Sequence, residues 1–154
     1  MNAAELAATA GKLIDEVEKL IPSCMENPDD RNNSHGNVTL MIVAEGGQLF
    51  GRMFGNDNPR RRHTSRIAWH KAIQVWMTGY ATGRYEELVY GKKIDPSKFG
   101  ISHPDFIGWE GGLPVVAKDG TKLAVAMSGF TGVTDCNIIR RAVTRVPGLA
   151  IAET

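Results

Sequence analysis

Two apolar runs that flank the dipeptide Asp119-Gly120 are the most constraining feature of the sequence. Together they extend from Leu113 to Gly129 and are preceded by the pair Gly111-Gly112. A tight turn between antiparallel strands favours residues that reach positive φ, which Asp tolerates and Gly adopts freely. The segment therefore predicts a β-hairpin closed by a primed turn.

The first third of the chain predicts a helix and a second hairpin. Residues 3 to 21 carry apolar side chains at helical spacing behind a capping box, and Pro22 is expected to end this helix. Residues 23 to 37 are rich in Asn, Asp, Ser and Pro and predict a solvated connecting loop. The apolar run Val38 to Ala44, a turn at Gly46-Gly47 and the run Gln48 to Met53 predict the hairpin.

After a turn-forming stretch from Phe54 to Pro59, the remaining chain predicts helices around the Asp119-Gly120 hairpin. The first is a long helix whose apolar face is wide enough to be covered on more than one side: Ile67, Ala68, Trp69, Ala72, Ile73, Val75, Trp76 and Tyr80. A short helix over Tyr85 to Tyr90 and a loop rich in Gly and Pro follow. Thr134 or Asp135 is expected to cap a last helix with apolar residues Ile138, Ile139, Ala142 and Val146, which ends at Pro147-Gly148.

The order helix, hairpin, helix, hairpin, helix predicts an α+β protein in which one antiparallel sheet is flanked by helices. Its 154 residues, 42% of them hydrophobic, suit a single domain over 1–154. The 18 Lys and Arg residues balance 17 Asp and Glu, so the chain lacks the net basic field of a nucleic-acid-binding protein.

The sequence also predicts a cytoplasmic protein that is not bound to a membrane. Charged residues interrupt the first 20 positions, and no run approaches the ~20 apolar residues that a membrane span needs. Cys24 and Cys136 lie far apart without a Cys-x-x-Cys pair, which is typical of a reduced protein and disfavours a structural zinc site.

Several segments, in order along the chain, resemble the GlcG/HbpS-like family of haem-binding (haem-degrading domain) proteins, which includes the C-terminal domain of PduO-type corrinoid adenosyltransferases. They lie between residues 5 and 146: Val38 to Leu49, Arg52, Lys71-Ala72, Gly111 to Val115, Asp119-Gly120 and Ser128-Gly129. The resemblance implies a profilin-like sheet flanked by helices, assembly into homo-oligomers, and haem or a related cofactor held between helix and sheet or between subunits. The chain departs from the family in Glu45, where Asp is frequent, and in a long loop from about 91 to 110.

A basic cluster, Arg60-Arg61-Arg62-His63, opens the long helix and is not a family signature. Cations at the positive end of a helix dipole are unfavourable unless an anion lies among them. The cluster therefore predicts one of two situations. It is either a site for a phosphate or a carboxylate, such as that of a haem propionate or a small organic acid, or a solvated turn paired with Asp57 or with an acidic residue of another subunit.

Histidines are the candidate haem-iron ligands. His63, Arg66, His70 and Gln74 share one helical face, on which His63 and His70 are about 10 Å apart, so only one of them can ligate a given iron from one chain. A structural role is the alternative for each. His103 is the candidate from the loop, whereas His35 is expected to be exposed.

Loop residues complete the predicted cofactor site. Phe106 and Trp109 favour a binding role because they lie outside a helical stripe, whereas Trp69, Trp76 and Tyr80 are expected in the core. Gly111 and Gly112 either shape a tight turn or expose backbone N–H groups to a ligand.

An enzyme is the alternative to a binding protein. Catalytic candidates are His63, His70 and Glu45, with Arg52, Lys71, Asp105 and Glu110 as further acid, base or anion-binding groups. No Gly-x-Ser-x-Gly, His-Glu-x-x-His, Walker or Gly-x-Gly-x-x-Gly motif is present. We therefore expect a haem- or cofactor-binding accessory, sensor or trafficking protein. The alternatives are an enzyme with a His general base, acting on a small anionic or aromatic metabolite in the same pocket, and a scaffold that only assembles.

Overall fold

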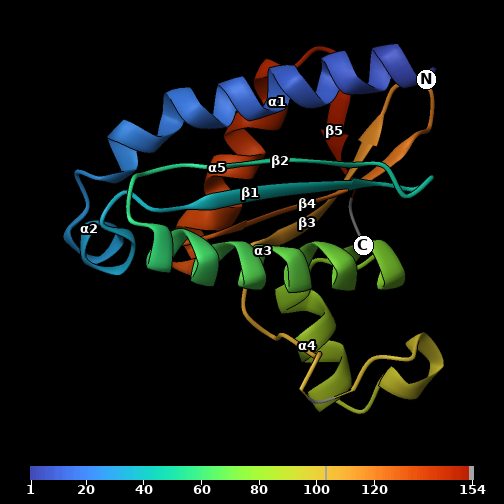
Figure 1. Cartoon of the computed structure of the whole chain (residues 1–154). Helices are drawn as coiled ribbons and strands as arrows, with labels where there is room; N and C mark the ends of the chain where they lie inside the picture. The colour runs from blue at the N-terminus through green and yellow to red at the C-terminus, as the bar shows by residue number, and fades with distance from the viewer. Residues whose placement is uncertain (103, 153–154) are drawn as a thin grey trace.

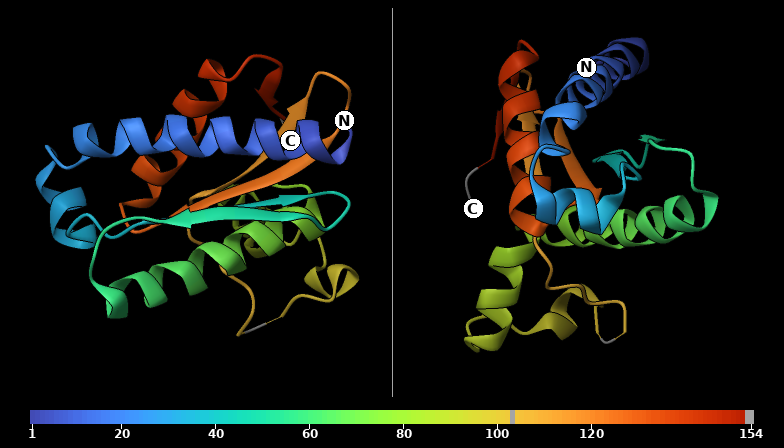
Figure 2. Two further views of the ribbon diagram at one scale, coloured as in Figure 1. Left: turned by 45° about the horizontal axis from the view of Figure 1, so that its top comes forward. Right: turned by 90° about the vertical axis from the view of Figure 1, so that its left-hand side faces the viewer.

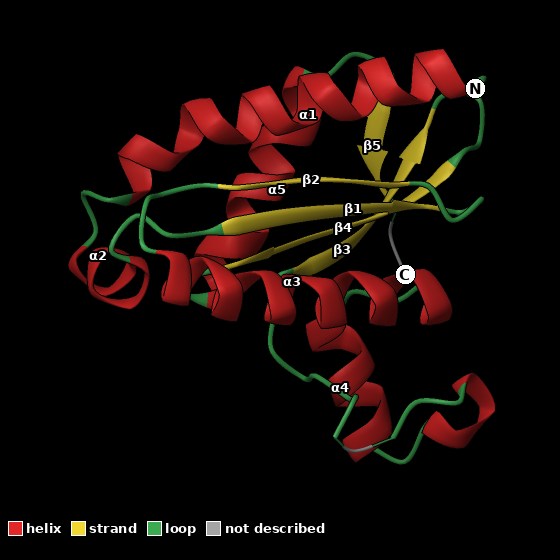
Figure 3. Ribbon diagram, in the orientation of Figure 1, coloured by secondary structure: helices red, strands yellow, loops and turns green. Residues whose placement is uncertain are grey.

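The computed structural model describes residues 1–102 and 104–152. Its helices are α1 (Ala3–Cys24), α2 (Pro28–Ser34), α3 (Asn58–Thr78), α4 (Thr82–Tyr90), the 3-10 turn η1 (Pro96–Phe99) and α5 (Gly132–Arg145). Its strands are β1 (Thr39–Ala44), β2 (Leu49–Met53), β3 (Gly112–Ala117), β4 (Lys122–Ser128) and β5 (Leu149–Ile151). They form one antiparallel sheet in the order β2-β1-β4-β3-β5, so the predicted α+β class is confirmed (Figure 3).

The sheet is the middle layer of the molecule. Figure 1 shows α1 and α5 on one face and α3 on the other, with α4 and the segment that leads to β3 beyond α3. Figure 2 shows the same layers from two further directions, with α4 projecting away from the sheet. The larger hydrophobic cluster lies between the sheet and α1 and α5, and it includes Leu13, Ile42 and Ile139.

Both hairpins form where the sequence predicts them, but the predicted primed turn is wrong. The Ala117 N–H donates to the Thr121 carbonyl, and the Gly120 N–H donates to the Ala117 carbonyl. Gly120 alone of the Asp119-Gly120 pair has positive φ, at 88°. The loop therefore has three residues, with glycine at the left-handed position, which is the next most common hairpin geometry. Gly47, with φ 85°, closes the β1–β2 hairpin in the same way.

Pro22 does not end the first helix, which continues to Cys24. A proline in the last turn removes one backbone hydrogen bond. The turn remains helical because Leu20 is buried and Cys24 packs against the same cluster. The Met25 N–H then bonds to the Pro22 carbonyl.

The segment from 23 to 37 is not a solvated loop. It contains α2, which begins after the N-cap Asn27 with Pro28 in the first turn. Asp30, Ser34 and Asn37 are buried. The prediction was wrong because polar residues that form hydrogen bonds inside the fold have the same composition as a loop.

The last helix begins earlier than predicted. Thr131 is the N-cap of α5, and its hydroxyl oxygen accepts a hydrogen bond from the Thr134 N–H at 3.4 Å. Asp135, one of the two predicted caps, lies inside the first turn and is buried. Strand β5, which the sequence analysis did not predict, follows α5 and pairs with β3.

Small residues set how α3 meets the sheet. Ala72 and Val75 of α3 pack against Ala124 and Ala126 of β4, so helix and sheet approach closely. The larger aromatic residues of α3 flank this seam, and Trp76 is 45% exposed. The expectation that Trp76 belongs to the core is therefore wrong. Gln74 was expected on a polar face, but only 2% of its surface is exposed.

Candidate functional site

The N-terminal half of α3 lines a wide basic groove on the outer side of the sheet. The groove has a volume of about 620 Å³ and is lined by Met41, Pro59, Arg62, His63, Ser65, Arg66 and Trp69; we call it the basic groove. Met41 and Trp69 supply apolar surface, and Arg62 and Arg66 supply guanidinium groups. Within the described ranges, the side chains of Arg62, His63 and Arg66 take part in no ion pair with another part of the chain.

The basic cluster is divided among different surroundings. Asp57 caps α3 by accepting the Arg60 N–H at 3.0 Å, and the Arg60 side chain lies 3.7 Å from the Asp57 carboxylate. Arg61 donates to the Asn58 side chain at 3.4 Å. Arg60 is thus paired with Asp57, as expected for a solvated turn, whereas Arg62 lines the basic groove. A neighbouring hollow of about 430 Å³ shares His63 and includes Arg60.

His70 lies in a smaller pocket of about 250 Å³ between α3 and the segment before β3. Trp69 lines both this pocket and the basic groove. The Gln74 side-chain oxygen accepts the Ile107 N–H at 2.9 Å, which fixes its amide. Among the residues that the structure describes, its buried Nε2 has no hydrogen-bond partner. The structure therefore places the two predicted iron ligands, His63 and His70, in different hollows.

Of the loop candidates that the structure describes, none lines the basic groove. Trp109 is 65% exposed, and His103 lies outside the described residues. Gly111 and Gly112 are buried, and the Gly112 N–H donates to the Thr82 hydroxyl at 3.2 Å. A Cβ on Gly111, whose φ is 127°, would lie 2.5 Å from the Lys71 Nζ. The tight-packing interpretation of these glycines explains their geometry.

Behind Gly111 lies a buried ion pair. The Lys71 Nζ is 3.1 Å from the Asp135 carboxylate and also donates to the Met127 carbonyl at 2.9 Å. Burial raises the pKa of Asp135 to about 7, against the opposing effect of the Lys71 ammonium. Because 4% or less of either side chain is exposed, the pair joins α3 to α5 rather than meeting a ligand. Lys71 is thus a structural residue.

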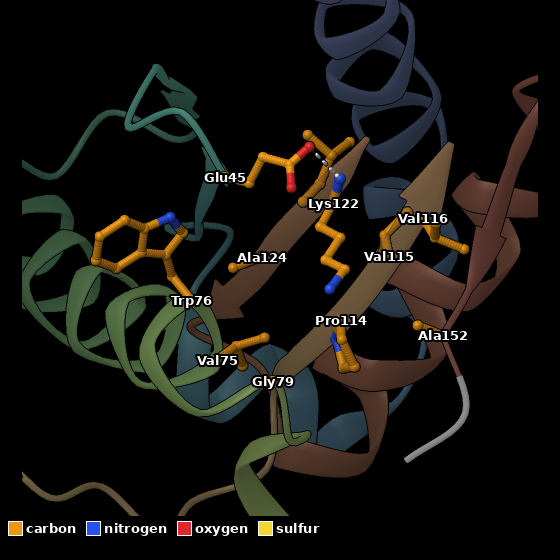
Figure 4. A pocket seen from close by; sticks show the side chains of 11 residues that line it. Glu45, Val75, Trp76, Gly79, Pro114, Val115, Val116, Lys122, Ala124 and Ala152 are labelled. Atoms are coloured by element: carbon orange, nitrogen blue, oxygen red, sulfur yellow. Dashed lines mark hydrogen bonds between the residues drawn. The ribbon is translucent and has the colours of Figure 1, made fainter. Parts of the chain in front are cut away.

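Glu45 lies at the opposite end of α3, in a second groove shown in Figure 4. This groove has a volume of about 480 Å³ and is mostly apolar; we call it the apolar groove. It is lined by Val75, Trp76 and Gly79 of the α3 end, by Pro114–Val116 of β3, by Lys122–Ala124 of β4, and by Glu45 and Ala152. One shared pocket was expected from the sequence, whereas the structure separates the arginine-lined groove from this one.

Neither cysteine resembles an activated nucleophile. Burial raises the pKa of the Cys24 thiol and of the Cys136 thiol, and both side chains pack against the larger hydrophobic cluster. In residues 1–102 and 104–152 no three His, Cys, Asp or Glu side chains are grouped to hold a metal ion. Over the same residues, no helix has the length and apolar character required to cross a membrane.

Sequence reasoning did not assign Met41 or Lys122 to a site, and it left Arg66 out of the anion site. Arg66 follows Arg62 and His63 by three or four positions, so helical spacing was a usable signal. Met41 reaches the groove because alternate residues of β1 face α3, which needed the sheet order. Lys122 is one of many lysines in the sequence, and nothing local distinguishes it.

The fold is that of a known class of small α+β proteins. No family model matches the sequence, and no curated protein matches it either. Solved structures match over most of their length, and the expected profilin-like arrangement is confirmed as a fold. A crystal structure of HbpS superposes with a TM-score of 0.63 at 18% identity, covering 90% of this chain and 87% of that one.

Two further structures agree. A solved complex of PduOC with haem has a TM-score of 0.62 at 14% identity, covering 99% of this chain and 96% of that one. Protein ORFY of Klebsiella pneumoniae, a DUF336 protein, has a TM-score of 0.60 at 20% identity, covering 89% of this chain and 86% of that one. The similarity to the GlcG/HbpS-like family is thus confirmed at the level of the fold.

Proposed function

We propose that this protein binds haem, or a related planar tetrapyrrole with carboxylate groups, in the basic groove. One observation carries the proposal: His63, Arg62 and Arg66 line one groove, which also presents the apolar surfaces of Met41 and Trp69. A tetrapyrrole needs the same combination of an apolar contact, cations for its carboxylates and one imidazole nitrogen for its iron.

The residues fit the group chemically. When bound, haem supplies an iron that accepts a nitrogen ligand and propionates that accept hydrogen bonds. His63 would ligate the iron, because it lines the groove and is exposed. Arg62 and Arg66 would hold the propionates, and Trp69 would supply apolar contact. The solved haem complex with the same fold supports the choice of ligand class.

We further propose that the protein acts as an accessory, sensing or trafficking protein in the cytoplasm and assembles into homo-oligomers. The exposed apolar side chains of the edge strand β2, Leu49 at 54% and Met53 at 46%, support assembly. Sedimentation at several protein concentrations tests this point, and a monomer throughout would contradict it.

Titration with hemin tests the proposed site. We expect a Soret shift that is lost in His63→Ala and retained in the matched control His35→Asn, which changes the exposed histidine at the C-cap of α2. Replacing Arg62 and Arg66 with Gln should weaken binding about threefold to tenfold at low salt and less at high salt, whereas the exposed Arg140→Gln should not.

The alternative ligands give different results. A shift that survives in His63→Ala but is lost in His70→Ala moves the iron to the smaller pocket. A shift unchanged when His63, His70 and His103 are all replaced by Ala removes histidine ligation altogether.

An enzyme remains the second candidate, favoured by the same groove, which is lined by one imidazole and two guanidinium groups. These residues would hold a small aromatic carboxylate, with His63 as general base. Turnover of such a metabolite by the apo-protein, abolished by His63→Ala, would favour this function over simple binding.

A further inference from the structure

The apolar groove is a separate feature from the basic groove. Arg62 and Trp76 are 14 positions apart on α3, which corresponds to about 21 Å along the helix. The two grooves share none of their lining residues. The nearest lining residues on α3, Trp69 of the basic groove and Val75 of the apolar groove, are still six positions apart, about 9 Å along the helix, so the two grooves are distinct.

The walls of the apolar groove are fixed by hydrogen bonds. The Trp76 indole N–H donates to the Ala44 carbonyl at 3.0 Å, which holds the ring beside the opening even though the residue is 45% exposed. The Ala152 N–H donates to the Pro114 carbonyl at 2.9 Å and fixes the opposite side. A wall that is ordered before binding reduces the entropy lost when a ligand binds.

The two charged residues at this groove differ in whether their charged groups already have a partner. The Glu45 carboxylate accepts the Lys122 backbone N–H at 3.3 Å, and the Glu45 N–H donates to the Lys122 carbonyl at 2.9 Å. The Lys122 side chain extends in the other direction, across the groove towards Pro114 (Figure 4). Within the described residues, its ammonium forms no ion pair. The groove therefore combines an apolar floor with one available cation.

We propose that the apolar groove is a second ligand site, which binds a small apolar monocarboxylate. The apolar part of such a ligand lies on Val75, Trp76, Pro114 and Ala124, and its carboxylate pairs with the Lys122 ammonium. The volume of about 480 Å³ lies within the range of small-molecule sites. Because Lys122 is the only cation among the described residues that line the groove, a ligand with one carboxylate matches the groove better than one with several.

Calorimetric titration with decanoate, kept below its critical micelle concentration, tests the proposal. We expect saturable binding with one decanoate per chain. Lys122→Gln should weaken it about fivefold at low salt, and Lys122→Arg should retain it. The neutral analogue 1-decanol should bind wild type and Lys122→Gln alike. Lys118→Gln is the matched control, because Lys118 is exposed in the same hairpin but does not line the groove.

Trp76→Ala removes one wall and should also weaken decanoate binding, while circular dichroism verifies that the variant is folded. Absence of saturable binding, or an equal loss in Lys118→Gln and Lys122→Gln, would overturn the proposal. So would decanoate affinity that falls as protein concentration rises, because a second copy would then cover the groove. Competitive displacement of decanoate by hemin would show one shared site, whereas failure of hemin to bind at all leaves this second site intact.

Discussion

The Lys71–Asp135 pair shows how a single contact is protected by the residues around it. The pair is buried where β3 begins, and Gly111 lies against it because no side chain fits there. A Cβ on Gly111 would also lie 2.8 Å from the Met127 carbonyl, which is the other acceptor of the Lys71 ammonium. The glycine is therefore required by the ion pair as well as by its own φ of 127°.

We expect Gly111→Ala to lower the free energy of unfolding by at least about 3 kcal/mol, because it combines a strained φ with close contacts to Lys71 and Met127. Gly120→Ala is the matched control. Its φ is also positive, at 88°, but the added Cβ meets nothing within 4 Å, so its cost should be about 1 kcal/mol. Urea unfolding of both variants measures the difference, and equal costs would contradict the steric explanation.

Asp135 should give the stability a specific dependence on pH. Its pKa is raised by burial from 3.8 to about 7, so between these values the folded protein keeps a proton that the unfolded chain releases. The contribution of this group to stability is therefore fully present below about pH 4 and decreases as the pH rises to about 7. We expect the stability of wild type relative to Asp135→Asn to fall over that range in urea titrations. A relative gain for wild type would mean that the ion pair keeps the carboxylate charged.

At the scale of elements, two helices are joined by one carboxylate. Asp30 of α2 accepts the Thr131 N–H at 2.8 Å and the Thr134 hydroxyl at 2.7 Å, so it completes the N-terminus of α5. These contacts cross 101 and 104 positions of sequence, respectively. The short helix α2 is thus a support for α5 and not merely a connection between α1 and β1.

Removing the Asp30 carboxylate should weaken the N-terminus of α5. We expect Asp30→Ala to cost about 2–3 kcal/mol of unfolding free energy, because two hydrogen bonds to a buried charged group are lost. Asp29→Ala is the matched control in the same first turn of α2. Asp29 is exposed, so its loss should cost less than about 1 kcal/mol through the helix dipole. Comparable losses in the two variants would show that α2 itself, rather than this contact, is what matters.

The same element shows what sequence can predict. Local periodicity was sufficient for α1, α3, α5 and both hairpins, since each has a repeated apolar pattern. It was insufficient for α2, where the decisive partners of Asp30 lie more than 100 positions away. It also failed at Trp76, because only the sheet order shows that small residues of β4 determine which face of α3 is buried. The same limit applies to the groove residues. Arg62 and His63 could be predicted because they form a local cluster in the sequence. Met41 and Lys122 could not, because only the arrangement of the sheet places them beside α3.

At the scale of the whole molecule, the two faces of the sheet differ in what covers them: one carries most of the core, and the other carries both grooves. The face towards α1 and α5 buries the larger hydrophobic cluster, whereas the basic and apolar grooves both lie on the α3 side. A smaller cluster beneath α3, built on Ala72 and Ala124, holds that helix in place. The α3 side can therefore contain two grooves, because most of the apolar core is formed on the other side.

Because of this division, we expect one variant to change stability without changing hemin binding, and another to change hemin binding without changing stability. Leu13→Ala, on the α1 side at 0% exposure, should lower the free energy of unfolding by about 2–5 kcal/mol. Its affinity for hemin should stay unchanged at temperatures where the variant is folded. Arg62→Gln should do the reverse, because an exposed guanidinium contributes little to folding but contacts the proposed ligand. Urea unfolding and hemin titration of the same two variants measure both quantities. If Leu13→Ala also weakened hemin binding in the folded state, the sheet would transmit changes between its faces, and the assignment of separate tasks would be wrong.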